Sequence, residues 1–311
     1  MKRTFIVDTD CGVDDAIALL MVLSSSDVDL AAITTVAGNT SIENVTRNVC
    51  LTLDIAERDV PVYRGCAQPL IDNLPGIGGL MGSDGLGDAS AGLPPTRRKS
   101  ESERAALALI RLSRQLPQPL TLVALGPLTN LALAIRLDPD FVQRISRLVL
   151  MGGAMYAQGN ASPTAEFNFF ADPEAAKIVL EAGFADLWVL PWETSVAQAL
   201  PWQEYDALIA LQTPKAEFLR VITTRVRGVL ENVFHLPGMP LPDPLAMAVA
   251  LDGHVASESA FLPAMIETGA GLGRGLMALE WFPQHSPNIH LVKRVDFAVV
   301  LSMLQKALSD S

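Results

Sequence analysis

The stretch that decides the fold is Thr4-Phe5-Ile6-Val7-Asp8-Thr9-Asp10-Cys11-Gly12-Val13-Asp14-Asp15, followed by Ala16-Ile17-Ala18-Leu19-Leu20. An apolar run leads into four aspartates within eight residues, and a helical pattern leads out. The stretch therefore predicts a buried strand, a tight acidic turn and the start of a helix. Carboxylates this close raise one another's pKa values, so protons or a metal ion must balance them. Hard oxygen ligands at this density favour Ca²⁺ or Mg²⁺ over zinc or copper.

The acidic stretch has a simpler explanation only in part. Asp14 and Asp15 are acidic residues in a first helical turn, where the helix dipole favours negative charge. That does not explain Asp8 and Asp10, which lie on or just after a buried strand, where charges are costly. Ligands of open α/β sheets bind at the carboxyl ends of the strands. We therefore favour a metal site, which a late aspartate, Asp243, would complete once the chain has folded.

Strand and helix patterns alternate along the first 190 residues. Apolar strands are predicted at residues 4–9, 29–36, 120–125, 147–151 and 186–190. Helical patterns are predicted between them at residues 14–24, 41–57, 101–116, 128–136 and 173–182. The strands from Leu120 to Leu125, Leu148 to Met151 and Leu187 to Leu190 are continuously apolar, as strands covered on both faces should be. The alternation predicts an α/β fold with a Rossmann-like open, mostly parallel sheet and helices on both faces.

The remaining segments are less regular. Residues 65–100 hold many Gly, Pro, Asp and Ser residues, including Gly76, Gly78, Gly79, Gly82, Gly85 and Gly87. They predict a long, mobile surface loop, and the sequence leaves open whether it acts as a lid. Helices are predicted within residues 200–232 and from Asp243 to Leu251, strands at 259–268, 276–282 and 288–294, and a last helix from Asp296. With no repeat or Ser-rich linker, we expect residues 1–311 to form a single domain.

Composition limits the possible partners. The 311 residues carry a net charge of −11, which argues against binding to nucleic acids or to anionic membranes. The three cysteines, Cys11, Cys50 and Cys66, provide no disulfide framework. No signal-peptide pattern is visible, and no apolar run is long enough to span a bilayer. We therefore expect a cytoplasmic protein that acts on a small molecule.

Two further segments combine a strand end with polar residues. Met151-Gly152-Gly153-Ala154, Asn160 and Glu166-Phe167-Asn168 offer donors and acceptors that suit vicinal hydroxyls, although a turn-rich loop capped by Asn explains them equally well. In Ala124-Leu125-Gly126-Pro127, the sharp turn is expected to leave the carbonyl of Leu125 unpaired and available to a cation. A simple strand-to-helix turn is an equally good explanation.

Two other motif interpretations are weaker. Asp8-Thr9-Asp10 is compatible with a metal-dependent phosphohydrolase whose first Asp is phosphorylated, but no Lys and acidic pair follows to complete that motif. The glycines at 269, 271, 273 and 275 suggest a nucleotide-binding loop, but they open no helix. A hairpin turn between two late strands is the better prediction for them.

Taken together, these segments resemble the inosine–uridine-preferring nucleoside hydrolase family. The resemblance covers most of the chain and is carried by the following segments: residues 8–16, Thr35-Val36-Ala37-Gly38-Asn39, Gly126-Pro127-Leu128-Thr129-Asn130, Met151-Gly152-Gly153-Ala154, Glu166-Phe167-Asn168 with residues 171–176, and Asp243-Pro244-Leu245-Ala246. It implies an enzyme that cleaves the N-glycosidic bond of ribonucleosides to ribose and free base. A Ca²⁺ ion would bind the attacking water and two ribose hydroxyls. Homodimers or homotetramers are also implied.

The resemblance also assigns roles to residues. Asp10, Asp15, Asp243 and the backbone carbonyl of Leu125 would be the calcium ligands, and Asp10 would be the general base. The ribose would be bound by Asp14, Asn39, Asn160, Glu166, Asn168 and Asp243. Carboxylates beside the sugar would stabilise an oxocarbenium-like transition state.

The sequence departs from the family pattern where the leaving base should sit. Pro242 stands where many members carry a His, and Met81 replaces another His of the glycine-rich loop. Cys11 and the segment Pro191-Trp192-Glu193-Thr194 resemble a minority branch. The possible contacts to the leaving base are His235, Trp192, Cys11 and Tyr156, each of which has an equally simple structural explanation. A scaffold that binds ribose or a nucleoside with impaired catalysis is therefore a second hypothesis.

Overall fold

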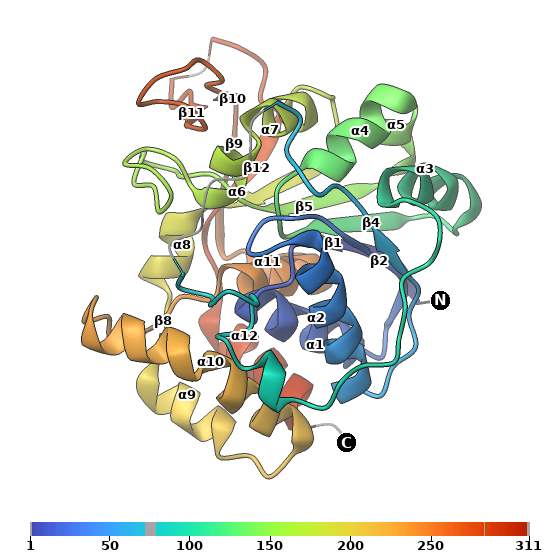
Figure 1. The fold of residues 1–311 in the computed structure, drawn as a ribbon. Helices are drawn as coiled ribbons and strands as arrows, with labels where there is room; N and C mark the ends of the chain where they lie inside the picture. The colour runs from blue at the N-terminus through green and yellow to red at the C-terminus, as the bar shows by residue number, and fades with distance from the viewer. Residues whose placement is uncertain (1, 72–78, 283, 310–311) are drawn as a thin grey trace.

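The first strand, β1 (Arg3–Thr9), lies in the middle of an eight-stranded sheet. In the computed structural model, which describes residues 2–71, 79–282 and 284–309, the strand order is β3-β2-β1-β4-β5-β6-β12-β9 (Figure 1). The other strands are β2 (Val28–Thr35), β3 (Val62–Arg64), β4 (Leu120–Ala124), β5 (Arg147–Met151), β6 (Leu187–Leu190), β9 (Glu258–Leu262) and β12 (Ile289–Arg294). All neighbours pair in parallel except β9, which runs antiparallel at one edge.

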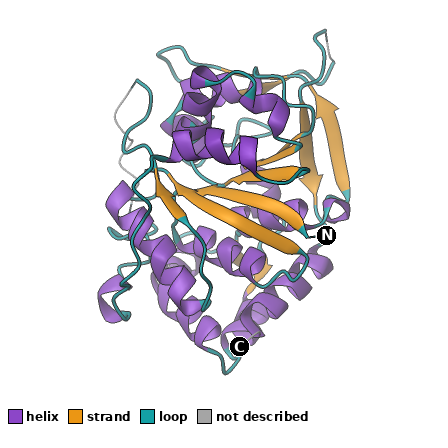
Figure 2. Ribbon diagram, turned by 90° about the vertical axis from the view of Figure 1, so that its right-hand side faces the viewer, coloured by secondary structure: helices purple, strands orange, loops and turns teal. Residues whose placement is uncertain are grey.

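Helices cover both faces of the sheet (Figure 2). One layer contains α1 (Val13–Leu23), α2 (Ile42–Ile55), α9 (Trp202–Ile209), α10 (Pro214–Asn232), α11 (Pro242–Leu251) and α12 (Phe297–Ser309). The other contains α3 (Ala105–Gln115), α4 (Thr129–Leu137), α5 (Phe141–Arg144) and α7 (Pro173–Leu180). The predicted α/β fold with an open, mostly parallel sheet is therefore confirmed.

The centre of β1, Phe5-Ile6-Val7, is apolar on both faces of the sheet. Phe5 and Val7 pack into the core beneath α1 and α11, whereas Ile6 packs into the core on the opposite face. Successive side chains of a strand point to opposite faces, so a strand covered on both sides has no polar face. Asp8 ends this run and is paired in register with Thr34 of β2 and Ala124 of β4. The acidic turn after β1 therefore lies at the carboxyl edge of the parallel strands.

The irregular segments differ from the sequence prediction in two places. Pro263 divides the predicted strand 259–268 into β9 and β10 (Ala264–Ile266), which belong to different sheets, because proline has no N–H for the ladder. β10 pairs with β11 (Met277–Leu279), so the predicted hairpin around Gly271 is confirmed. Residues 65–100 contain only a short 3₁₀ turn among the described residues, but Leu86 is fully buried, so this part does not lie wholly on the surface. Gly76 and Gly78 lie outside the described residues.

Several short elements are absent from the sequence prediction. They include β3, α5, α6 (Phe167–Ala171) and α8 (Trp192–Ala197), and the two-residue strands β7 (Leu200–Pro201) and β8 (Gly238–Met239). Each is six residues or shorter, which is too short for a periodic pattern to be recognised. Among the described residues, no helix is both long enough and apolar enough to cross a bilayer.

Candidate active site

The turn after β1 is organised around the carboxylate of Asp15. The hydroxyl of Thr9 donates a hydrogen bond to Asp15 Oδ1 at 2.5 Å, and the backbone N–H of Gly12 donates to Oδ2 at 2.8 Å. Asp15 is the third residue of α1, and its carboxylate satisfies the N–H of the residue that caps the helix. These bonds define where α1 begins and fix the Asp15 side chain below the carboxyl edge of the sheet.

Asp10 is held in the same turn by the segment that follows β2. The backbone N–H of Asn39 donates to Asp10 Oδ2 at 2.7 Å, and the Asn39 side-chain amide donates to Asp15 Oδ2 at 3.2 Å. Two glycines give Asp10 its space. A Cβ added at Gly38 would lie 2.1 Å from Asp10 Oδ2, and one added at Gly126 would lie 2.7 Å from Oδ1. The glycines of two predicted motifs are therefore explained by their contact with Asp10.

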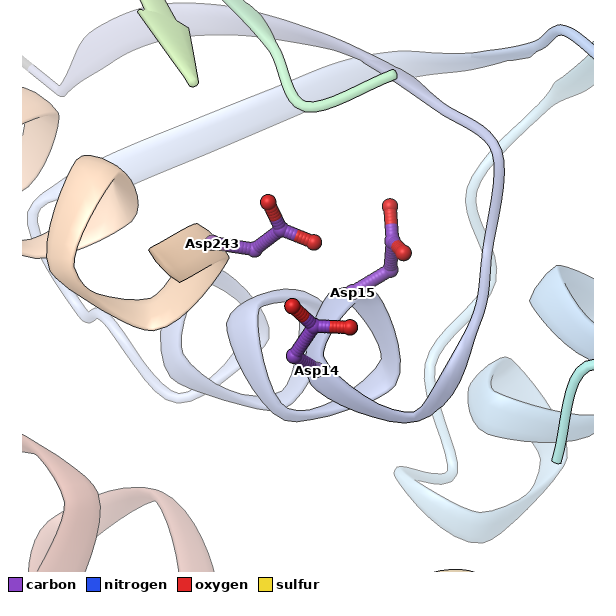
Figure 3. Close-up of side chains that lie close together, drawn as sticks. All are labelled: Asp14, Asp15 and Asp243. Carbon is purple, nitrogen blue, oxygen red and sulfur yellow. The ribbon is translucent and has the colours of Figure 1, made fainter. Parts of the chain in front are cut away.

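The late aspartate joins the early ones, as the sequence predicts. Asp243 lies in the first turn of α11, which packs against α1, and it is buried. Carboxylate oxygens of Asp14, Asp15 and Asp243 all lie within 4.8 Å of one another (Figure 3). Asp14 belongs to this group, although the family resemblance assigns it to the ribose. Asp10 lies outside the group but close enough for its charge to raise the pKa of Asp243.

Burial and mutual repulsion disfavour the ionised forms of these carboxyls. Burial raises the pKa of Asp10 well above its usual value, and the charge of Asp15 adds to the effect. Burial and the charges of Asp14 and Asp15 likewise raise the pKa of Asp243. The pKa of Asp14 rises to about 7, mainly through burial and then through Asp15. So many buried acids are stable in ionised form only if a cation compensates them.

Unpaired oxygen atoms show that the group fits a divalent cation. Asp10 Oδ1 and Asp14 Oδ1 are buried and have no hydrogen-bond partner among the described residues. Buried polar atoms in native proteins are almost always satisfied by protein, water or an ion. Clustered carboxylate oxygens are the ligands that hard divalent cations prefer. The acidic group at the carboxyl edge therefore suits a bound metal ion.

The carbonyl of Leu125 is not unpaired, which corrects the prediction made for this turn. The side-chain amide of Asn168 donates to the Leu125 oxygen at 2.7 Å and to the Met151 oxygen at 3.1 Å. Asn168 thus ties together the carboxyl ends of β4 and β5. A carbonyl oxygen has two lone pairs, so Leu125 keeps one that can bind a cation. The turn alone did not reveal this partner because Asn168 lies 43 residues further along the chain.

Glu166 and Asn160 shape the loop between β5 and α6. The Glu166 carboxylate is buried and accepts hydrogen bonds from the backbone N–H groups of Gly153, Asn168 and Phe169. Burial nevertheless raises its pKa to about 7. Asn160 is exposed, and its side-chain oxygen accepts the N–H of Phe167 at 2.8 Å. Both residues therefore cap the start of α6, in addition to any contact with a sugar.

The surroundings of Asp8 argue against the phosphohydrolase alternative. Asp8 has no exposed surface, and its Oδ1 accepts hydrogen bonds from Thr34 and from the side-chain amide of Asn130. Burial raises its pKa to about 7. A carboxylate that must attack a phosphate needs access to it, which Asp8 lacks. Its role in the turn is to join β1, β2 and the start of α4.

The four possible contacts to a leaving base lie in different surroundings. Cys11 is fully buried, and its thiol pKa is raised by burial and by Asp15, so it has the character of an inert core thiol. Trp192 is half-buried, and its backbone N–H donates to the Gly153 carbonyl. Tyr156 is exposed and stacks on Trp281. His235 is exposed in a left-handed backbone conformation after α10. None of these observations assigns an acid for the leaving base.

The sequence is similar to a known protein family and to individual members of it. Residues 5–302 match the family model described as inosine-uridine preferring nucleoside hydrolase. The chain is 37% identical over 284 residues to a Leishmania major protein of that name, covering 90% of this chain and 88% of the relative. It is 43% identical over 187 residues to uridine nucleosidase 1 of Arabidopsis thaliana, covering 60% of this chain and 55% of that relative. The match to the plant protein thus spans about half of its length.

Solved structures agree with the sequence comparison. An inosine-guanosine nucleoside hydrolase superposes with a TM-score of 0.92 at 30% identity, covering 100% of both chains. A purine-preferring ribonucleoside hydrolase from Gardnerella vaginalis gives a TM-score of 0.89 at 28% identity, covering 99% of this chain and 98% of that chain. Both the acidic edge of the sheet and these similarities lead to one conclusion: the chain belongs to the inosine-uridine preferring nucleoside hydrolase family, a family of ribonucleoside hydrolases.

Proposed function

We propose that this protein hydrolyses the N-glycosidic bond of ribonucleosides with one Ca²⁺ ion bound at the acidic edge of the sheet. The observation that carries the proposal is the buried group formed by Asp14, Asp15 and Asp243 beside Asp10, in which Asp10 Oδ1 and Asp14 Oδ1 have no hydrogen-bond partner among the described residues. Asp10, Asp15, Asp243 and the Leu125 carbonyl would hold the ion. When bound, Ca²⁺ would favour ionisation of water and offer coordination to sugar hydroxyls.

The side chains around this group would bind the ribose. Asn39 and Asn168 form hydrogen bonds to the groups that would hold the ion. A sugar whose hydroxyls bind that ion would therefore lie beside both side chains. Asp14, Asn160 and Glu166 would supply further acceptors and donors. Asn168 has its amide nitrogen bound to two carbonyls, so its amide oxygen is the atom left for a hydroxyl donor. This division of roles follows from the hydrogen bonds and from the family to which the chain belongs.

Asp10 would act as the general base. Its Oδ2 is fixed by the Asn39 N–H, whereas its Oδ1 is buried, has no hydrogen-bond partner in the part of the chain that the structure describes, and could accept a proton from the attacking water. As the glycosidic bond breaks, positive charge develops on the sugar, and the surrounding carboxylates would stabilise it. The base would leave with the bonding electrons and take up a proton.

The test of this proposal is the variant Asp10→Ala. We expect the rate of ribose release from every nucleoside to fall by ~10⁴-fold or more, because both the base and an ion ligand are lost. The fold should persist, since removing one buried acid relieves repulsion. Asp29→Ala, an exposed carboxylate on β2, is the matched control and should keep full activity. Ribose release by the folded Asp10→Ala variant at the wild-type rate would refute the assigned base.

A second candidate function is binding of ribose or nucleosides without efficient turnover. It is favoured by Pro242, the buried first residue of α11, and Met81, which occupy positions where a histidine could protonate the base. Hydrolysis of p-nitrophenyl riboside separates the candidates because its leaving group needs little protonation. Turnover of this compound but not of inosine or uridine would mean intact ribose chemistry without activation of the base. Binding with no turnover of any ribosyl compound would favour the binding protein.

A further inference from the structure

Glu193 makes an unusual set of contacts for a surface helix residue. It lies in the first turn of α8, directly after β6, and is half-buried. Its carboxylate accepts the backbone N–H groups of Met155 at 2.7 Å, Tyr156 at 2.7 Å and Gln158 at 3.3 Å. Hydrogen bonds to an ionised acceptor are about twice as strong as neutral ones. The loop after β5 is therefore wrapped around a carboxylate that belongs to a different element.

The backbone of this loop is bent to form that pocket. Ala157 has a φ of 56°, a left-handed backbone conformation that is energetically unfavourable for alanine. Backbone N–H groups on either side of such a residue converge and form a concave anion site. Here the anion is the Glu193 side chain. The neighbouring residue, Trp192, adds a backbone bond from its N–H to the Gly153 carbonyl at 2.9 Å.

The loop continues directly into the candidate ribose-binding residues. It begins at Gly153, whose N–H donates to Glu166 at 2.8 Å, and it contains Asn160, whose side-chain oxygen accepts the Phe167 N–H. Thus Glu166 closes the loop at its base, and Glu193 fixes its first half. Tyr156 is stacked on Trp281 with ring centroids 5.8 Å apart, which anchors the outer side. Without Glu193, the N–H groups of Met155, Tyr156 and Gln158 would lose this acceptor, whereas the bonds in the second half of the loop, such as that from Thr164 to the Leu272 carbonyl, would remain.

We propose that Glu193 is a positioning residue that holds residues 153–166 in the conformation needed to present Asn160 and Glu166 to the ribose. The inference rests on the proposed function, which it deepens by naming what orders the sugar-binding loop. Glu193 itself would not touch the substrate. Glu193 would keep the loop ordered before the ribose binds. The entropy cost of ordering the loop would then not reduce the affinity for the sugar.

The test compares Glu193→Gln with Glu174→Gln. The Glu193→Gln side chain keeps one acceptor oxygen. Its NH₂ group would face a backbone N–H of the loop, and two donors cannot form a hydrogen bond with each other. Glu174 is the matched control, because its carboxylate also accepts two hydrogen bonds, from Arg274 at 2.8 Å and 3.0 Å, but it joins α7 to the β10–β11 hairpin. Thermal unfolding, backbone hydrogen exchange, and kcat and KM for uridine and inosine would be measured on each calcium-loaded variant.

We expect both variants to lose thermal stability, but only Glu193→Gln should speed hydrogen exchange at residues 155–158. Only Glu193→Gln should raise KM, on the order of tenfold or more, with a smaller change in kcat. If it folds poorly, Glu193→Asp keeps the charge with a shorter reach and should show an intermediate KM. An unchanged KM in a Glu193 variant with faster loop exchange would overturn the inference alone. Absence of ribose release by the wild type would overturn the proposed function and the inference together.

Discussion

The side-chain amide of Asn130 donates a hydrogen bond of 2.8 Å to the carboxylate of Asp8, a residue 122 positions earlier in the chain. The same amide nitrogen donates to the Thr35 carbonyl at 2.9 Å, and the Asn130 oxygen accepts the Cys66 N–H at 3.0 Å. Asn130 is fully buried and thus satisfies groups at the ends of β1, β2 and β3. It therefore stabilises the carboxyl ends of the strands that precede the acidic turn.

Replacing Asn130 with Ala should therefore destabilise the fold strongly. The Asp8 carboxylate would keep only its bond from Thr34, and the buried Thr35 carbonyl and the half-buried Cys66 N–H would each lose their bond to Asn130. Each buried group left unsatisfied costs about 1–3 kcal/mol. We expect the free energy of unfolding in urea to fall by about 3 kcal/mol or more. The control Asn232→Ala removes an exposed amide that donates to the Gly228 carbonyl of its own helix, and it should change stability by less than about 0.5 kcal/mol. A loss no larger than that of the control would contradict the role assigned to Asn130.

Gly38→Ala should disrupt the position of Asp10. The added Cβ would lie 2.1 Å from Asp10 Oδ2 and 2.8 Å from its Cβ, so the Asp10 side chain must move. Because a displacement of about 1 Å in a catalytic group can cost on the order of 10²-fold in rate, we expect kcat/KM to fall by at least that factor. Gly228→Ala is the control, since its Cβ meets nothing within 4 Å and alanine favours the helix. Equal activity in the two variants would show that Asp10 does not need this space.

The acidic group should bind one Ca²⁺ per chain, measurable by calorimetry and elemental analysis. Calcium should raise the midpoint of thermal unfolding, because a ligand that binds only the folded state stabilises it by about 2.7 kcal/mol at 100 times its Kd. Asp15→Asn should weaken calcium binding by at least ~10-fold, since it removes a charged ligand. The exposed substitution Asp29→Asn should leave binding unchanged. A different stoichiometric metal, or none, would contradict the assignment.

Glu166 should make stability depend on pH in a definite direction. Burial raises its pKa from 4.5 to about 7 in the folded state. Between these two pH values the folded protein therefore holds a proton that the unfolded chain has released. Its contribution to stability is therefore present below pH 4.5 and is lost as pH rises to about 7. The difference in unfolding free energy between wild type and Glu166→Gln should decline across this range by at most about 3 kcal/mol. A difference that is constant or rises with pH would contradict the raised pKa.

Much of the fold is predictable from sequence because its strands are buried on both faces. β1, β4 and β5 each have an apolar centre that is buried on both faces, and their boundaries agree with the prediction to within one residue. The acidic turn was recognisable for the same reason, since charged residues after a buried strand require an explanation. Asp243 is assigned to the same site in the sequence analysis, but its contact with the turn depends on how the chain folds. Spacing in the sequence contains no information that α11 packs against α1.

The remaining features depend on contacts that one sequence does not display. The bond from Asn168 to the Leu125 carbonyl, and the three bonds from the loop to Glu193, join residues more than 30 positions apart. A carboxylate that binds backbone N–H groups leaves no mark in the composition of its partners, because any residue supplies an N–H. The positive φ of Ala157 was equally hidden, since the usual signal for that conformation is Gly or Asn.

The packing of α11 against α1 places Asp243 beside residues from the start of the chain. During synthesis, the first carboxylates leave the ribosome long before the last one exists. A nascent chain can build most of the parallel sheet without being able to enclose an ion with high affinity. Capture of the cation would then be a late event that reports completion of the whole assembly, and a truncated product ending before α11 would be left with an uncompensated charge at its centre.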